Sequence, residues 1–458
     1  MTHQDESVVG PGERIPLRLF VRGQSAPRAA SVSLRLPGAK YYTLRYLLAA
    51  LLAVGVSRVR NPARSDDTDV LMRALRALGA NIAEESDEDD WILRIMGTGG
   101  HLSSPLGNTL NVGNAGAVLR LLLGIGALLP EMTFVTDHPQ SLGRRPNADL
   151  LVALSQLGLR VEANGPDGLL PITLRGGPPA GGAVTVSGAR SSQYLSALLY
   201  LAPLLSQGLR ITVTDGLRSA DLVRATLRAL AESGIRVEAA ADLRTFTVAG
   251  GQHYRPRDVT VPGDVPSAAA LAVAALLLGQ PARLAALDGS QRETVALLAA
   301  FAAFGAPVTL ADGVMSIAAE LPLRGARLDG DPLIDSVPVL VAAACFAEGE
   351  SRFENAAHLR LKESDRIGDL CAELRRAGCD VQPLDDGILV RGQPAGIEGG
   401  VTVDAHDDHR LAQALALVAL RCRTGLTITG ADAIAKSYPT FFADLQRLGA
   451  EVRDTMSA

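Results

Sequence analysis

Two kinds of apolar segment alternate along the chain. In the first kind, apolar residues recur at positions i, i+3 and i+4, and a glycine with an apolar pair ends the segment, as in LMRALRALGANI and FFADLQRLGAEV. This pattern predicts an amphipathic helix with a glycine just past its C-terminus. The segments recur every 71 to 79 residues, a period that indicates a duplicated supersecondary unit. Their glycines are Gly79, Gly158, Gly234, Gly305, Gly378 and Gly449.

The second kind of segment is apolar nearly all round, as in YLLAALLAVG, AAALAVAALLLG and LAQALALVAL. A helix without a polar face has no side to turn to solvent, so we expect these helices inside a domain and the amphipathic ones outside. Six segments of each kind divide evenly into three plus three. The pattern therefore predicts two similar α/β domains, each with inner helices under an outer layer of sheets and helices.

Glycine and proline interrupt the pattern near Gly38 and at Pro262-Gly263. We predict that the chain crosses between the domains at these two places. Residues 1–38 and 262–458 would then form a discontinuous lower domain, and residues 39–261 the upper domain. The length of 458 residues also favours two cores over one. We expect the first 30 residues to form a loose extension.

Composition narrows the class of protein. With 47% hydrophobic and 20% charged residues the chain is typical of a soluble globular protein, and its net charge of -5 gives no reason to expect a nucleic-acid partner. No apolar run reaches the roughly 18 residues of a membrane span, and the acidic start of the chain is not that of a signal peptide. We therefore expect a cytoplasmic protein without a membrane partner. The four cysteines predict free thiols in a reducing compartment.

Short polar motifs precede the predicted inner helices. Helix N-termini carry free N–H groups and the positive end of the helix dipole, so each one attracts anions. One such start is a weak signal, but six in register, one in each repeat, can face a single cleft. The motifs are PGAK with Arg45, VGNAGA with Arg120, RSSQ ending at Gln193, PGDVPS ending at Ser267, LIDSVP with Asp335, and HDDHR ending at Arg410.

Lysine is rare in this chain and occurs only at junctions of this kind. Of the 44 basic residues, only Lys40, Lys362 and Lys436 are lysines. Arginine is sufficient for a charged surface, whereas lysine is a compact point charge that can release a proton. The placement of the three lysines therefore predicts a site that binds phosphate or moves protons.

Taken together, the motifs resemble a known family. The series PGAK…R, GNAGA..R, RRP, SSQ, GD..S, IDSVP, KESDR, DDHR and AK is similar in order and spacing to that of the EPSP synthases (3-phosphoshikimate 1-carboxyvinyltransferases), from about Val32 to Val452. The resemblance implies a two-domain inside-out α/β barrel, with three βαβαββ repeats in each domain and the active site in the cleft between them. It also implies transfer of the enolpyruvyl group of phosphoenolpyruvate to a hydroxyl of a phosphorylated acceptor, with release of phosphate and without a metal or other cofactor. We expect a monomer whose partners are these small-molecule substrates.

The resemblance also assigns roles to residues. Asp335 would orient and help deprotonate the attacking hydroxyl, Glu363 would protonate the methylene carbon of phosphoenolpyruvate, and His409 would assist. With Lys40, these three make up the predicted catalytic set. The predicted phosphoenolpyruvate ligands are Lys40, Gly116, Arg145, Gln193, Arg366, Arg410 and Lys436. The predicted acceptor ligands are Tyr41, Arg45, Ser191, Ser192, Gln193, Ser219, Asp335, His358 and Lys362.

On the acceptor side the chain departs from the family's pattern. Where the family has a small hydroxyl residue, a polar residue, a threonine, an aromatic residue and an asparagine, this chain has Tyr41, Leu44, Ala117, Leu222 and His358. The phosphoenolpyruvate ligands are intact. Two interpretations therefore stay open. The default acceptor is 3-phosphoshikimate, and the alternative is a nucleoside monophosphate such as UMP, as in nucleoside-antibiotic pathways, with Tyr41 stacked on the base.

Three other functions have less support in the sequence. The related UDP-N-acetylglucosamine enolpyruvyl transferases have a loop cysteine where this chain has Gln140. A metal-dependent phosphoesterase could use the histidines and aspartates of AHDDHR, but no second cluster supplies the remaining ligands. A non-catalytic binding protein has no need of a set of proton-transfer residues, which are here Lys40, Asp335, Glu363 and Lys436.

Overall fold

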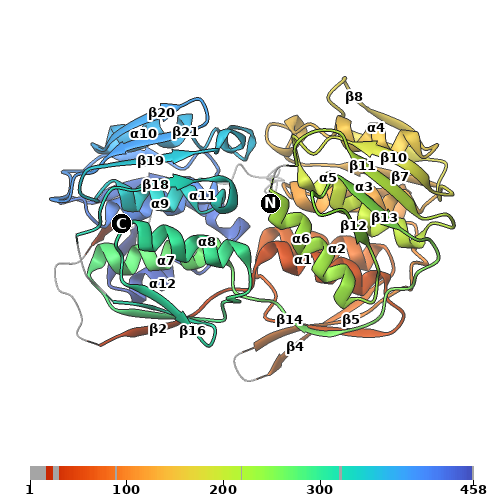
Figure 1. Ribbon diagram of the computed structural model, residues 1–458, viewed down its shortest axis with the longest axis horizontal. Coiled ribbons are helices and arrows are strands. Elements are labelled where there is room, and N and C mark those ends of the chain that lie inside the picture. Colours follow the sequence, from red (N-terminus) through yellow and green to blue (C-terminus); the bar gives the residue numbers. More distant parts are fainter. Residues whose placement is uncertain (1–16, 24–29, 88–89, 218, 319–321, 456–458) are drawn as a thin grey trace, which may run out of the picture.

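The computed structural model describes residues 17–23, 30–87, 90–217, 219–318 and 322–455. This part of the chain forms six four-stranded sheets with their helices, arranged as two groups of three units (Figure 1). Each unit has the order β-α-β-α-β-β. The predicted α/β fold of six repeated units is therefore confirmed.

One group is built mainly from the last part of the chain. Each of its sheets has one parallel pair of strands, and the other pairs are antiparallel; Leu328 lies opposite Phe353 in a parallel pair, for example, and Phe353 opposite Ile388 in an antiparallel one. The three units are β2 (Val32–Arg35), α7 (Val265–Leu278), β15 (Ala282–Ala285), α8 (Arg292–Ala303), β16 (Val308–Ala311) and β17 (Val314–Ile317); β18 (Arg327–Asp329), α9 (Val337–Ala344), β19 (Glu350–Glu354), α10 (Gly368–Ala377), β20 (Asp380–Leu384) and β21 (Gly387–Arg391); and β22 (Thr402–Asp404), α11 (His409–Ala419), β23 (Leu426–Thr429), α12 (Phe441–Arg447), β24 (Ala450–Asp454) and β1 (Leu19–Gly23).

The other group repeats the same arrangement with the earlier part of the chain. Its three units are β14 (Asp258–Thr260), α1 (Lys40–Leu52), β3 (Val56–Arg60), α2 (Asp66–Ala77), β4 (Asn81–Asp87) and β5 (Asp90–Met96); β6 (Thr109–Asn111), α3 (Gly116–Gly126), β7 (Glu131–Val135), α4 (Ala148–Gln156), β8 (Arg160–Asn164) and β9 (Leu169–Arg175); and β10 (Gly182–Val186), α5 (Ser192–Leu201), β11 (Leu209–Val213), α6 (Ala220–Glu232), β12 (Glu238–Ala239) and β13 (Thr245–Val248). Short 3-10 helices connect these elements: η1 (Leu106–Asn108), η2 (Leu142–Arg144), η3 (Ala202–Leu204), η4 (Asp331–Leu333), η5 (Ala357–Leu361) and η6 (Ala431–Lys436).

The inner helices are buried as their composition predicts. Every residue of α7 from Val265 to Leu277 is buried, and α9 and α11 are buried along their whole length. The amphipathic helices end as predicted too. All six of their glycines have positive φ, from 70° at Gly305 to 109° at Gly449, a conformation that glycine adopts without strain.

The chain passes twice between the two groups. Strand β2 pairs in parallel with β15 but leads into α1, and β14 pairs in parallel with β3 but leads into α7. The two passages meet where Gly38 and Gly263 form an antiparallel bridge. A Cβ at Gly38 would lie 1.9 Å from the carbonyl oxygen of Asn61, so only glycine fits there.

Two separate clusters of buried apolar side chains correspond to the two groups. One contains residues between Leu19 and Leu36 and between Val265 and Ala450, and the other contains residues between Ala39 and Val261. The domain boundaries themselves stay a prediction.

The expectation of a loose extension over the first 30 residues is wrong in part. Residues 1–16 and 24–29 lie outside the described residues, but Leu19–Gly23 form β1, which pairs with both β23 and β24. Leu19 and Val21 of this strand are buried in the core. In LRLFVR, Leu17, Leu19 and Val21 alternate with Arg18, Phe20 and Arg22, which is the period of a half-buried strand and could have predicted β1.

Candidate active site

A cavity of about 940 Å³ opens between the two groups of units. All six inner helices begin at or next to its wall, which places their free N–H groups around one space. The structure brings together every residue that the sequence analysis assigned to the site. The residues that line the cavity include Lys40, Tyr41, Arg45, Gly116, Arg145, Ser191, Ser192, Gln193, Ser219, Asp335, His358, Lys362, Glu363, Arg366, His409, Arg410 and Lys436.

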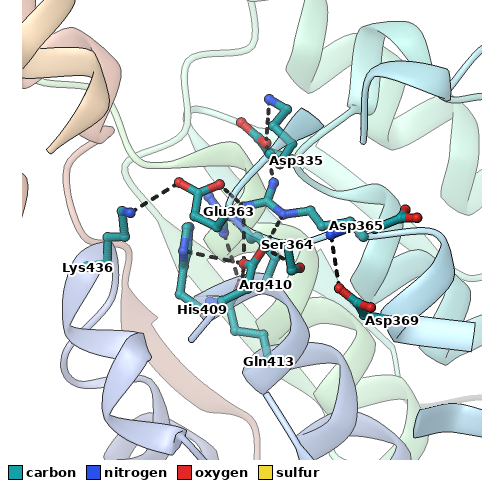
Figure 2. A network of polar contacts seen from close by, with 12 residues as sticks. Asp335, Glu363, Ser364, Asp365, Asp369, His409, Arg410, Gln413 and Lys436 are labelled. Carbon is teal, nitrogen blue, oxygen red and sulfur yellow. Dashed lines mark hydrogen bonds and ion pairs between the residues drawn. The ribbon is translucent and has the colours of Figure 1, made fainter. Parts of the chain in front are cut away.

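The carboxylate of Glu363 lies among three basic side chains. Its Oε1 is 3.3 Å from Lys436 Nζ, as Figure 2 shows, and 3.6 Å from Arg145 Nη2. Its Oε2 accepts a hydrogen bond of 2.8 Å from Arg366 Nη2. Glu363 follows η5, Lys436 ends η6, and Arg145 follows η2 in the other group of units. Segments from both groups therefore meet at one carboxylate.

The guanidinium of Arg366 connects the carboxylates of the site. Arg366 is 1% exposed, and it donates to Asp408 at 2.7 Å and to Asp335 at 2.9 Å as well as to Glu363. Asp408 is the N-cap of α11, where it also accepts from the backbone N–H of Arg410. Arg366 thus fixes both predicted catalytic carboxylates to the start of an inner helix. Each of its three nitrogens already has a protein partner.

Basic neighbours set the charge of both carboxyls. Burial alone would raise the pKa of Asp335, but the charges of Lys362 and Arg366 outweigh it and hold this pKa below its usual range. Lys362 Nζ is 3.3 Å from Asp335 Oδ1. Burial would likewise raise the pKa of Glu363, but the charges of Lys436 and Arg366 lower it well below the ordinary value. Without substrate, both carboxyls are therefore ionised.

Some of the buried donors of the residues that line the cavity lack a hydrogen-bond partner within the described residues. Arg145 Nη2, Lys436 Nζ and Arg410 Nε are buried and donate to no atom of the described residues. Buried N–H groups are nearly always satisfied, so these three indicate the place of an anionic ligand. The start of α3 lies beside Arg145. A Cβ at Gly116 would be 2.9 Å from Arg145 Nη1, so glycine lets the guanidinium approach this helix terminus.

Lys40 and His409 lie at the starts of two inner helices. Lys40 Nζ forms an ion pair of 3.0 Å with Asp67, a buried carboxylate in the first turn of α2. Burial lowers the pKa of His409 well below its ordinary value, and the positive charges of Arg410 and Lys40 lower it further. The imidazole is therefore neutral at physiological pH.

On the acceptor side, the helix starts present polar groups to the cavity. Ser191 is the N-cap of α5 and accepts from the backbone N–H of Gln193, whose side-chain oxygen accepts 2.9 Å from Arg120. Ser219 begins α6 with a left-handed φ of 51° and does not cap the helix with its side chain. A non-glycine residue in this conformation is strained, which is typical of functional positions.

Arg45 is held by protein groups. Its three nitrogens donate to Thr226 Oγ1 and to the carbonyl oxygens of Tyr41 and Leu222, and the residue is buried. These bonds tie α1 to α6. A direct contact between Arg45 and the acceptor stays a prediction.

Asp67 and Glu293 are among the acidic residues of the cavity that were not predicted from the sequence. Both lie in the first turn of an amphipathic helix, where an acid is expected to interact with the helix dipole. Nothing in the local sequence distinguishes them from ordinary helix-start acids. Only the tertiary arrangement turns them toward the cavity.

The motif AHDDHR does not form a metal centre in this structure. His406 Nε2 lies 3.4 Å from Glu373, whereas Asp408 binds Arg366 and caps α11. Across the described part of the chain, no group of three or more His, Cys, Asp or Glu side chains is arranged to hold a metal ion.

Six helix starts around one cavity, with two carboxylates among fixed basic side chains, define an enzyme of small anionic substrates. Comparison with known proteins gives the family. The family model described as EPSP synthase (3-phosphoshikimate 1-carboxyvinyltransferase) matches residues 25–445. A protein of Deinococcus radiodurans named 3-phosphoshikimate 1-carboxyvinyltransferase is 46% identical over 421 residues, which cover 91% of this chain and 93% of that protein. The chain belongs to the EPSP synthase family.

Solved structures agree with this assignment. An EPSP synthase from Acinetobacter baumannii superposes with a TM-score of 0.80 at 26% identity, over 96% of this chain and 100% of that one. The enolpyruvyl transferase NikO from Streptomyces tendae superposes with a TM-score of 0.75 at 21% identity, over 96% and 99% of the two chains, and shares the fold. None of the described helices is both long and apolar enough to span a membrane.

Proposed function

We propose that this chain transfers the enolpyruvyl group of phosphoenolpyruvate to a hydroxyl of 3-phosphoshikimate and releases phosphate. The observation that carries the proposal is the meeting of Lys436, Arg145 and Arg366 at Glu363, where Lys436 Nζ and Arg145 Nη2 are buried and make no hydrogen bond within the described residues. Phosphoenolpyruvate brings a phosphate and a carboxylate, and basic side chains of this kind bind both. Membership of the EPSP synthase family supports the same reaction.

The residues account for each proton of the reaction. The acceptor hydroxyl attacks C2 of phosphoenolpyruvate and gives its proton to Asp335, while Glu363 gives a proton to C3. The tetrahedral intermediate then loses phosphate, and C3 returns a proton to Glu363, which restores the double bond in the product. The proton held by Asp335 leaves with the phosphate. The charges of Lys436 and Arg145 stabilise the phosphate as its bond to carbon breaks.

Substrate binding supplies the protonated form of Glu363. In the free protein, Lys436 and Arg366 keep this carboxyl ionised, and an ionised carboxylate cannot donate a proton. The phosphate and carboxylate of phosphoenolpyruvate offset these positive charges. The pKa of Glu363 therefore rises in the complex, and the carboxyl becomes a proton donor when its substrate is present.

The choice of acceptor follows from the relatives. The relatives named 3-phosphoshikimate 1-carboxyvinyltransferase include one that is 46% identical to this chain. The likeness to NikO extends to the fold alone. We therefore favour 3-phosphoshikimate over UMP, with the substitutions at Tyr41 and Leu222 as changes within the acceptor pocket.

An assay of phosphate release tests the proposed function. Phosphoenolpyruvate is supplied with 3-phosphoshikimate, with UMP or with neither. We expect turnover with 3-phosphoshikimate. Turnover with UMP but not with 3-phosphoshikimate would make UMP the acceptor. If no phosphorylated alcohol supports turnover, the proposal is overturned. The cytoplasmic location and the monomeric state also stay predictions, and light scattering during gel filtration tests the second.

A further inference from the structure

A second cavity of about 270 Å³ lies beside the main one. Four residues line both cavities and so form the wall between them: Tyr41, Asp221, Leu222 and Glu293. Tyr41 is on α1 and Glu293 is on α8, which belong to opposite groups of units. The wall is therefore completed only where the two groups meet.

A hydrogen bond between the two groups closes the wall. Tyr41 Oη lies 3.1 Å from Glu293 Oε2, to which it donates, and 3.3 Å from Gln291 Oε1. Gln291 is the N-cap of α8 and Glu293 is in its first turn, so the helix start fixes both acceptors. The Tyr41 ring also packs against Tyr42, with 4.9 Å between the ring centroids. The hydroxyl of Tyr41 is thus held by the start of α8, and its ring by Tyr42.

Two ion pairs cross the same gap. Arg228 Nη1 lies 2.6 Å from Asp288, and Arg292 Nε lies 3.6 Å from Asp221. Each pair joins α6 to the group of units that contains α8. They join the same two groups of units as the hydrogen bond between Tyr41 and Glu293.

The carboxyl of Glu293 lines the main cavity in surroundings that favour its protonated form. Burial raises its pKa to about 8, with a further contribution from the negative charges of Asp264 and Asp335. The hydrogen bond from Tyr41 and the charge of Arg410 act in the opposite direction. These groups face Glu293 from α1, α11 and the starts of α7 and α9. A protonated carboxyl accepts from the phenol with one oxygen, and it can border an anionic ligand without repelling it.

We propose that Glu293 is a positioning residue for the acceptor. It fixes the Tyr41 ring as the end wall of the acceptor pocket, and so restricts the enzyme to compact phosphorylated rings that end at this wall. This inference rests on the proposed function. Release of Tyr41 opens the pocket into the side cavity, and the acceptor then loses its wall. Lys436 and Arg145 line the main cavity alone, so phosphoenolpyruvate keeps its ligands.

Steady-state kinetics with both substrates test the proposal. Tyr41→Phe removes only the hydroxyl, and Glu293→Ala removes its partner. Each should raise KM for 3-phosphoshikimate by about three- to tenfold, the equivalent of one hydrogen bond, and change KM for phosphoenolpyruvate by less than about twofold. Glu293→Gln keeps a neutral acceptor for the phenol and should restore most of the acceptor affinity. The double variant Tyr41→Phe/Glu293→Ala should be no worse than either single variant.

A matched control is available on the same helix. Tyr46 donates 2.6 Å to Glu232, and neither residue lines either cavity. Tyr46→Phe removes a comparable phenol–carboxylate bond and should leave both KM values at those of the wild type. A general loosening of α1 would instead change the KM values of Tyr41→Phe and Tyr46→Phe in the same way.

Acceptor choice gives a second readout. Tyr41→Ser joins the two cavities, so the ratio of kcat/KM for UMP to that for 3-phosphoshikimate should rise. The proposal is overturned if wild-type enzyme turns over 3-phosphoshikimate and the variants change neither the acceptor KM nor this ratio. If calorimetry shows that the wild type binds no 3-phosphoshikimate, the proposed function fails and the inference fails with it.

Discussion

Lys436 Nζ lies 3.3 Å from Glu363 Oε1, so the last lysine of the chain and the predicted proton donor form one largely buried ion pair. The pair joins the predicted phosphate-binding side chain to the predicted proton donor. The cation that is predicted to bind phosphate also keeps the acid ionised until phosphate arrives. Under the proposed function, substrate binding and protonation of Glu363 are therefore coupled, and this ion pair is one of the contacts that couple them.

Loss of the Lys436 or the Arg145 side chain should abolish most turnover. Lys436→Ala and Arg145→Ala each remove a charge that faces the proposed phosphate. We expect kcat/KM for phosphoenolpyruvate to fall by about 10² or more, the usual effect of removing one group that stabilises transition-state charge. Arg423→Ala is a suitable control, because Arg423 is 81% exposed and does not line the cavity. Near-normal rates for both site variants, with unchanged melting temperatures, would remove these residues from the site.

Glu363→Gln should bind both substrates and react slowly. The amide keeps the size of the side chain and can still accept from Arg366, but it has no acidic proton to give. We expect turnover to fall by about 10² or more, the usual contribution of a general acid. The direct measurement is deuterium incorporation at the methylene carbon of phosphoenolpyruvate in heavy water. Incorporation at the wild-type rate would assign the proton transfer to another group.

Local patterns in the sequence predicted most of the fold. Residues such as Gly305 and Gly449 follow amphipathic helices, and the αL conformation they adopt depends on a few neighbouring residues. The burial of α7 likewise follows from its lack of any polar face. Strand β1 was missed because it is short and its partners, β23 and β24, are about 400 residues further along the chain.

The site was predicted in part. Lysine usage and the resemblance to the EPSP synthases found the residues around Glu363, because these residues are set in recognisable motifs. Arg45 and Glu293 depend on tertiary context. The guanidinium of Arg45 is held by groups of α1 and α6, and Glu293 faces the cavity only because α8 lies opposite Tyr41. No periodicity within one segment carries that information.

The pair of Arg366 and Asp408 should contribute strongly to stability. Asp408→Ala leaves Arg366 buried with one carboxylate fewer and also removes the cap of α11. Breaking a buried ion pair from one side typically costs about 3–5 kcal/mol of the free energy of unfolding. Arg327→Ala breaks an ion pair with Glu354 in which Arg327 is 76% exposed, and should cost less than about 1 kcal/mol. Equal losses in urea denaturation would contradict the difference in burial.

Finally, the carboxyl of Glu293 should make stability depend on pH. Its pKa rises from the ordinary 4.5 to about 8, first because of burial and then because of Asp264 and Asp335. Between these two values the folded protein holds a proton that the unfolded chain has released, so the free energy of unfolding falls as pH rises through this window. The contribution of that proton is complete below pH 4.5 and lost above about pH 8.

Glu293→Gln cannot ionise and should lose this dependence. We expect the difference in melting temperature between Glu293→Gln and the wild type to increase from about pH 5 to about pH 9, in favour of the variant. Glu232→Gln is the matched control, because Glu232 also accepts a phenol hydrogen bond, from Tyr46 on the same helix as Tyr41. If the difference for Glu293→Gln is the same at every pH, the carboxyl of Glu293 is ionised throughout, and its protonated form has no part in holding Tyr41.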